Sequence, residues 1–284
     1  MSRAETLNLF LASLAFATPL LLAALGELMG ERSGVLNIGL EGMMLCGAWA
    51  GAAASFASQS PLIGLIAAMG AGVLLAALFA LLVLNCKADA IVAGTGLNLF
   101  ALGATGVAHR AMIERYGNYD ASTLPMWFFF VLAALLIPTM WCLLHKTRAG
   151  LQLRAAGEYP AAAEASGASV VRLRWASTLF NGGLCGMAGA FLAMSHTDSF
   201  AENMTAGNGF IALAIVIFGR WSPLGALGAA LLFAAAKATQ FQLQSQISTQ
   251  WYPLLLALPY VLTILTLAGF AGKTKAPATL GEAG

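Results

Sequence analysis

The sequence predicts an all-α membrane protein, a polytopic bundle of about nine hydrophobic helices. Two features of the composition predict this class: 60% of the 284 residues are hydrophobic and only 9% are charged. Soluble domains average about 25% charged residues, so this chain lacks the side chains needed for a water-facing surface. The 31 glycines are a third indication, because small residues let membrane helices pack closely.

Nine apolar stretches are candidates for spans, each of which needs about 20 helical residues. They lie near 6–29, 40–58, 62–85, 89–111, 124–145, 173–194, 205–219, 224–242 and 251–270. The stretch at 205–219 is short for a span. Pro61 and Pro223 stand just before span starts, where a missing N–H costs no hydrogen bond. Pro138 and Pro259 fall inside spans, where they predict kinks.

The distribution of Lys and Arg predicts the orientation, because short cytoplasmic loops carry an excess of positive charge. With the N-terminus outside, most of the 14 Lys and Arg residues fall on the cytoplasmic side. These are Arg32, Lys87, Lys146, Arg148, Arg154, Arg172, Arg174, Arg220, Lys273 and Lys275. We therefore expect the N-terminus outside the cell and the C-terminus inside it.

The chain is predicted to form one transmembrane domain over residues 1–272, followed by a disordered tail over 273–284. Its one long polar insertion is the cytoplasmic loop 146–174. An Ala- and Glu-rich stretch of this loop favours one short helix, with Pro160 suited to its first turn and Gly167 to its C-terminal cap. Such a helix is either an ordinary connector or an element through which a soluble partner moves the membrane helices.

A segment near the N-terminus, GELMGERSGVLNIGLEGMMLCGAWAG, places polar residues and glycines between two apolar runs. A bilayer tolerates polar groups and broken backbone only where protein or a water-filled cavity surrounds them. The segment is therefore either the lining of a pathway or a packing knot that holds a pathway together.

The choice between these two interpretations depends on five polar residues of the segment. Asn37 and Glu41 are four positions apart, so on a helix they would share a face and line a pathway. Glu41 could instead cap a broken helix by accepting backbone N–H bonds. Glu27 and Glu31 are expected to lie at the cytoplasmic interface together with Arg32.

Two further sites in the chain carry polar residues of interest. Asn98 lies within a predicted span, where its side chain either contacts a solute or bridges helices. The outside segment SHTDSFAENMTAGNGF holds Asp198, Glu202 and Asn203, which we expect to form a periplasmic rim that docks a partner or helps to gate the pathway. The spacing of His196 and these acids does not indicate a metal site.

Motifs for catalysis are not evident. The AGKT sequence at 271–274 resembles the end of a phosphate-binding loop, but Leu267 stands where the loop needs a glycine. The four cysteines lie in or beside apolar runs and are predicted to be packing residues. We therefore expect no enzyme activity, no cofactor bound by this chain and no nucleic-acid partner.

Three blocks of sequence resemble the permease subunits of bacterial ABC importers: GERSGVLNIGLEGMMLCGAWAG, GLQLRAAGEYPAAAEASGASVVRLR and FAENMTAGNGFIALAIVIFGRWSPLGALGAALLF. The likeness is to the branch that imports branched-chain amino acids, ribose and other simple sugars, and nucleosides. Within it, the chain is most similar to the shorter of two paired permeases of nucleoside importers. The resemblance covers about residues 20 to 235.

The resemblance implies a multi-pass protein of the bacterial inner membrane, embedded in lipid, that works with other subunits. Those subunits are a cytoplasmic ATPase, which binds the ATP, a second related permease, and a periplasmic or lipid-anchored solute-binding protein. It also implies that the cytoplasmic loop carries a coupling helix that sits in a groove of the ATPase. The residues that match that block here are Gly157, Glu158, Pro160, Ala162, Ala163 and Gly167.

Three positions depart from the pattern of that family. Asn208 stands where many relatives are expected to have an arginine, and Ala168 replaces an isoleucine. Lys237 sits in a predicted span, where an acidic or small residue is more usual. The first and third departures leave the substrate open.

Together these features predict the transmembrane subunit of an ATP-driven importer for a small polar solute, with a nucleoside favoured. A simple sugar such as ribose, or another small metabolite, is the alternative within the family. A different class of transporter, driven by an ion gradient, would need ion ligands at broken helices. Asn37, Glu41 and Asn98 could supply some of those ligands.

Overall fold

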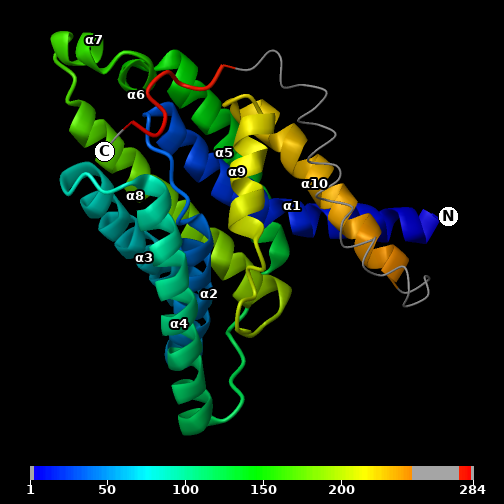
Figure 1. Ribbon diagram of the computed structural model, residues 1–284. Coiled ribbons are helices and arrows are strands. Elements are labelled where there is room, and N and C mark those ends of the chain that lie inside the picture. Colours follow the sequence, from blue (N-terminus) through cyan, green and yellow to red (C-terminus); the bar gives the residue numbers. More distant parts are fainter. Residues whose placement is uncertain (1–2, 245–274, 283–284) are drawn as a thin grey trace.

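The computed structural model describes residues 3–244 and 275–282, and every regular element in these two ranges is helical. The fold is the all-α membrane bundle that the sequence predicts (Figure 1). In chain order the elements are α1 (Arg3–Arg32), α2 (Leu40–Ser58), α3 (Pro61–Ala80), the π-helical turn η1 (Leu81–Asn85), α4 (Ala90–Tyr116), α5 (Met126–Lys146), α6 (Arg148–Glu158), α7 (Pro160–Ala165), α8 (Val170–Phe191), the π-helical turn η2 (Leu192–His196), α9 (Asn208–Phe218) and α10 (Pro223–Gln244).

Six of the described helical stretches are long and apolar enough to cross a membrane, and each overlaps a predicted span. They are Leu9–Arg32, Pro61–Asn85, Ala90–Tyr116, Met126–Lys146, Val170–His196 and Pro223–Gln242. Helix α2, with 19 residues, covers the predicted span at 40–58 but is not among these six. The short stretch predicted at 205–219 contains the apolar helix α9, whose 11 residues, or about 16 Å, are fewer than a full span needs. The span predicted at 251–270 lies outside the described residues.

Helix α8 lies at the centre of the bundle and packs most extensively against α3, α1 and α2. Glycines allow this close approach. A Cβ atom added to Gly72 would lie 2.1 Å from the carbonyl oxygen of Gly182, and one added to Gly186 would lie 2.2 Å from that of Ala68. Helices α3 and α8 therefore meet backbone to backbone, which is one use of the high glycine content.

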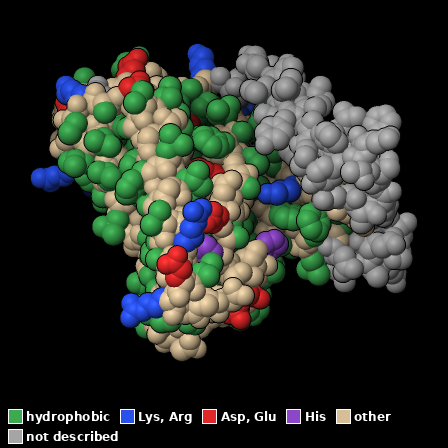
Figure 2. Space-filling model, turned by 60° about the horizontal axis from the view of Figure 1, so that its bottom comes forward, with side chains coloured by type: hydrophobic (Ala, Val, Ile, Leu, Met, Phe, Trp, Pro, Cys, Tyr) green, Lys and Arg blue, Asp and Glu red, His purple; other side chains and the backbone are tan. Residues whose placement is uncertain are grey.

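The outer surface of the bundle is largely apolar. Figure 2 shows hydrophobic side chains over much of the visible face, with few charged side chains between them. Helix α4 contributes strongly to this surface, since Leu99 and Val107 are each 71% exposed. Lipid or another membrane protein has to cover such a surface.

The loop at 146–174 contains two helices, α6 and α7, so the prediction of a single helix there is wrong. The side chain of Thr147 caps α6 by accepting a hydrogen bond from its first turn, a signal in the sequence that the prediction overlooked. After Tyr159 the chain enters α7 with Pro160 at its first position, as predicted. Gly167, with φ of +84°, follows just beyond the end of α7.

Candidate functional site

Glu41 joins the first turns of two helices. It lies at the start of α2, and its Oε1 and Oε2 atoms accept hydrogen bonds from the N–H groups of Gly207 and Gly209, both at 2.7 Å. These groups belong to the N-terminus of α9, which has no side-chain cap from its own N-cap residue. Glu41 therefore caps a broken helix, and the positive ends of two helix dipoles stabilise its negative charge.

The Gly-Asn-Gly sequence at 207–209 makes this arrangement possible. Gly207 has φ of +84°, a conformation that favours glycine. A Cβ atom on Gly209 would lie only 2.5 Å from the backbone nitrogen of Glu41. The two glycines were a visible signal for a helix start, but no local pattern indicated that the carboxylate capping this helix would come from α2.

The start of α2 is capped from α4. The Oδ1 atom of Asn98 accepts a hydrogen bond from the N–H of Gly42 at 2.8 Å, and its Nδ2 atom donates to the carbonyl of Ile38 at 2.9 Å. Asn98 therefore bridges helices. Asn37 lies in the turn before α2, so the expectation that it shares a helix face with Glu41 is wrong.

A cavity of about 350 Å³ opens beside these caps, between α2, α4 and the start of α9. Glu41, Asn98 and Asn203 bring polar groups to its wall, and Phe210 is part of its apolar wall. The other apolar walls are Leu45, Leu99 and Leu102. Asn37 is 1% exposed and is not among the lining residues. The structure thus brings together two of the three expected pathway residues and adds Asn203 from the expected rim.

Two residues that depart from the expected family pattern contact each other beside this cavity. The Nζ atom of Lys237 donates a hydrogen bond to Oδ1 of Asn208 at 2.9 Å. The same atom lies 5.4 Å from the centre of the Phe16 ring. The ammonium group of Lys237 thus points into the bundle, where its charge also interacts with the carboxylate of Glu41.

Glu27 is enclosed by protein. It is 0% exposed, so protein groups and not solvent surround its carboxylate. Its Oε1 atom accepts from the backbone N–H of Asn37 at 2.9 Å, and its Oε2 atom accepts from Nδ2 of Asn181 at 2.6 Å. The carboxylate therefore ties the turn after α1 to the central helix α8.

Glu31 is also buried, at 1% exposed. Its carboxylate accepts a hydrogen bond from Nε1 of Trp221. The Nε and Nη2 atoms of Arg32 donate to the backbone carbonyl of Trp221 at 2.8 Å and 2.6 Å. The end of α1 is thus fastened to the turn between α9 and α10. These contacts form the packing knot that the sequence suggested.

The three residues of the expected rim take different positions. Glu202 forms an ion pair with Arg110 near the end of α4, with 2.8 Å between Oε1 and Nε. The hydrogen bond from this guanidinium, together with its charge, holds the pKa of Glu202 below its usual value. Asn203 lines the cavity, whereas Asp198 is exposed. Within residues 3–244 and 275–282, no cluster of three His, Cys, Asp or Glu side chains is placed to hold a metal ion.

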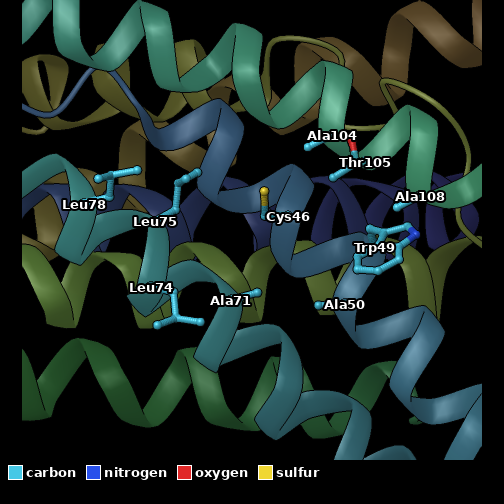
Figure 3. Close-up of a pocket in the computed structure, with 10 residues that line it drawn as sticks. All are labelled: Cys46, Trp49, Ala50, Ala71, Leu74, Leu75, Leu78, Ala104, Thr105 and Ala108. Atoms are coloured by element: carbon cyan, nitrogen blue, oxygen red, sulfur yellow. The ribbon is translucent and has the colours of Figure 1, made fainter.

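A second cavity, of about 410 Å³, lies between α2, α3 and α4 (Figure 3). Cys46 and Trp49 line it from α2, and Leu74 and Leu75 line it from α3. The Nε1 atom of Trp49 is buried and has no hydrogen-bond partner in the described part of the chain. This cavity offers few polar groups, so it suits a polar solute less well than the cavity beside Glu41.

The residues expected to form the coupling helix lie together in α6, α7 and the turn after them. Gly157 is buried at the end of α6, while Glu158 and Ala162 are exposed. Ala163 is 2% exposed and packs in a small cluster with residues at the start of α8. The sequence interpretation did not single out Tyr159, which stands between α6 and α7 and is 73% exposed. A large aromatic side chain left open to this extent is a candidate contact for a protein partner.

Comparison with known proteins gives consistent similarities. The family described as "branched-chain amino acid transport system / permease component" matches residues 9–267. The guanosine ABC transporter permease protein NupQ of Bacillus subtilis is 34% identical, covering 95% of this chain and 94% of that protein. The nucleoside ABC transporter permease protein NupC of Lactococcus lactis is 35% identical, covering 98% and 96%.

A third relative is named for another solute. The putative glucose ABC transporter permease protein TsgC13 of Haloferax volcanii is 33% identical, covering 82% of this chain and 77% of that protein. No solved structure gives a significant match to the chain.

Proposed function

We propose that this chain, which belongs to the permease family of branched-chain amino acid transport systems and is the membrane-spanning subunit of an ABC transporter, translocates nucleosides. The two relatives with the highest coverage carry guanosine or nucleoside in their names and match almost the whole chain. The relative named for glucose makes a simple sugar the second candidate.

The cavity beside Glu41 is the observation that carries this proposal. Its volume of about 350 Å³ suits a small solute, and its wall combines an aromatic ring, Phe210, with polar groups of Glu41, Asn98 and Asn203. A nucleoside has the complementary surface: a flat base with apolar faces and a ribose whose hydroxyl groups can donate to a carboxylate. A sugar would use the hydroxyl contacts but would leave the apolar wall without a matching surface.

Membership of the family supports our proposal for the other subunits and for the orientation of this chain. We place the N-terminus outside and the loop with α6 and α7 in the cytoplasm, where α7 is the coupling helix for an ATPase. A second permease, homologous or identical, completes the pathway, and a solute-binding protein delivers the nucleoside to the side that carries Asp198, Glu202 and Asn203. ATP-driven closure of the ATPases then moves α7 and changes which side of the cavity is open.

Uptake into proteoliposomes that contain the complete transporter tests the choice of solute. Labelled guanosine should enter only with ATP, should still enter after ionophores collapse the ion gradients, and should be competed by other nucleosides. Equal competition by ribose or glucose would overturn the nucleoside assignment. Uptake that stops when the gradients collapse would favour the ion-driven alternative.

The coupling assignment needs a separate test, for which the loop offers a matched pair. Tyr159 is 73% exposed and Leu151, on α6, is 61% exposed, so truncating either side chain should leave the fold intact. Tyr159→Ala should weaken capture of the ATPase about ten-fold, the effect of losing a central interface residue. Leu151→Ala is the control and should retain capture. Equal retention by both variants would contradict docking at α7.

A further inference from the structure

The C-terminal segment of the chain lies beside the loop that contains α6 and α7. Residues 275–282, part of the stretch expected to be a disordered tail, lie against the end of α6, and Figure 1 shows them in red at the end of the bundle that carries α7. The backbone N–H of Thr279 and its Oγ1 both donate to the carbonyl of Gly157, at 3.0 Å and 2.8 Å. The N–H of Gly281 donates to the carbonyl of Gly34 at 3.3 Å.

These contacts use backbone groups that the helix cannot satisfy. The last four carbonyl groups of a helix lack intrahelical partners, and Gly157 is in the last turn of α6. Thr279 supplies two donors to that carbonyl. Apolar contacts add to the hydrogen bonds, since Pro277 is buried and Leu280 packs against the main hydrophobic core.

Two glycines allow the three segments to meet. A Cβ atom on Gly157 would lie 2.4 Å from the carbonyl oxygen of Arg32, so the end of α6 touches the backbone at the end of α1. A Cβ atom on Gly34, whose φ is +93°, would lie 2.8 Å from Oγ1 of Thr279. The end of α1, the end of α6 and the C-terminal segment thus form one three-way junction.

We propose that residues 277–282 are a C-terminal clasp that fixes α7 to the turn between α1 and α2, with Thr279 as its positioning residue. On one side of the junction the chain runs from Gly157 into α7. On the other side it runs from Gly34 to Asn37 and then Glu41, which carries the cap of α9. The clasp holds these two paths together, so that movement of α7 reaches the cavity. This inference rests on the proposed docking of the ATPase to α7.

Three variants in the complete transporter test the clasp. Deletion of residues 276–284 removes it, and Thr279→Val removes one donor while keeping the length of the chain and the shape of the side chain. Glu282→Gln is the control, because that side chain is exposed. The first measurement is hydrogen exchange of the backbone amides in α7, which reports local opening without depending on transport. The second is the number of nucleosides taken up per ATP hydrolysed.

The deletion should speed exchange in α7 about ten-fold and lower uptake per ATP, and Thr279→Val should speed exchange about three-fold, in line with the loss of one hydrogen bond. Glu282→Gln should behave as the parent. Unchanged exchange in both clasp variants would overturn the clasp. Faster exchange with unchanged uptake per ATP would overturn its role in coupling, while the Tyr159→Ala experiment judges ATPase docking independently.

Discussion

Helices α8 and α4 are both long, apolar and rich in glycine, yet they occupy opposite kinds of position. In α8 89% of the apolar stretch is buried, and in α4 only 22% is buried. Gly182, Gly186 and Gly189 of α8 meet neighbouring backbones at short distances, whereas Gly96 and Gly103 of α4 have nothing within 4 Å of an added Cβ atom.

The difference shows that glycine content alone does not identify a central helix. Gly182, Gly186 and Gly189 of α8 recur about one turn apart on the face that contacts α2 and α3, which is the pattern of close helix packing. Those of α4 lie partly on its open side. Because α4 also walls both cavities, its open side suits the second permease that the proposed pathway requires.

The largest expected difference in stability between α8 and α4 comes from replacing one glycine of each helix by alanine. Gly186→Ala should destabilise the protein by about 2–3 kcal/mol, because the new Cβ would lie 2.2 Å from the carbonyl of Ala68. Gly103→Ala in α4 should be neutral or slightly stabilising, since alanine favours a helix by up to about 1 kcal/mol. Thermal unfolding of the purified chain in detergent measures both. Similar losses would mean that α4 is as tightly packed as α8.

A smaller contrast is expected for two asparagines. Asn181→Ala should cost about 2–3 kcal/mol, because it removes a hydrogen-bond donor from the buried carboxylate of Glu27. Asn98→Ala should cost about 1–2 kcal/mol for two neutral hydrogen bonds.

Transport should rank these asparagine variants in the other order. Asn98 lines the cavity, so Asn98→Ala should reduce nucleoside uptake more per folded molecule than Asn181→Ala does. Uptake normalised to the amount of folded protein checks this order. The reverse ranking would remove Asn98 from the pathway.

The smallest effect is expected at the exposed ion pair between Arg110 of α4 and Glu202. Arg110→Gln should leave stability almost unchanged near pH 7, because exposed pairs contribute little. The pKa of Glu202 is lower in the folded state than in the unfolded state. Any stabilisation from the ion pair is therefore present above the unfolded pKa of about 4.3, and it is lost as the pH falls through the lowered folded-state value. Unfolding measured at pH 7 and in acid, with and without salt, should show this small loss for the parent and none for Arg110→Gln.

Much of the fold could be predicted because long apolar runs map directly onto helices. The contacts of the polar residues were harder to predict. Glu41 and Asn98 stood out because polar residues are rare in such runs, but their partners could not be found by local spacing. The burial of Glu27 depends on Asn181, which is 154 positions away in the chain. Only the packing of α1 against α8 brings these residues together. The contact between Thr279 and Gly157 likewise joins residues that are 122 positions apart.

The cap of α9 by Glu41 has a consequence for biogenesis. Its two donors follow it in the chain by 166 and 168 positions, so at 5–20 residues per second roughly ten to thirty seconds of synthesis separate them. During that interval the carboxylate of Glu41 lacks its two donors. Water or the insertion machinery must therefore solvate it. The cap therefore forms only after the chain from α1 to the start of α9 has been made, and α10 follows it.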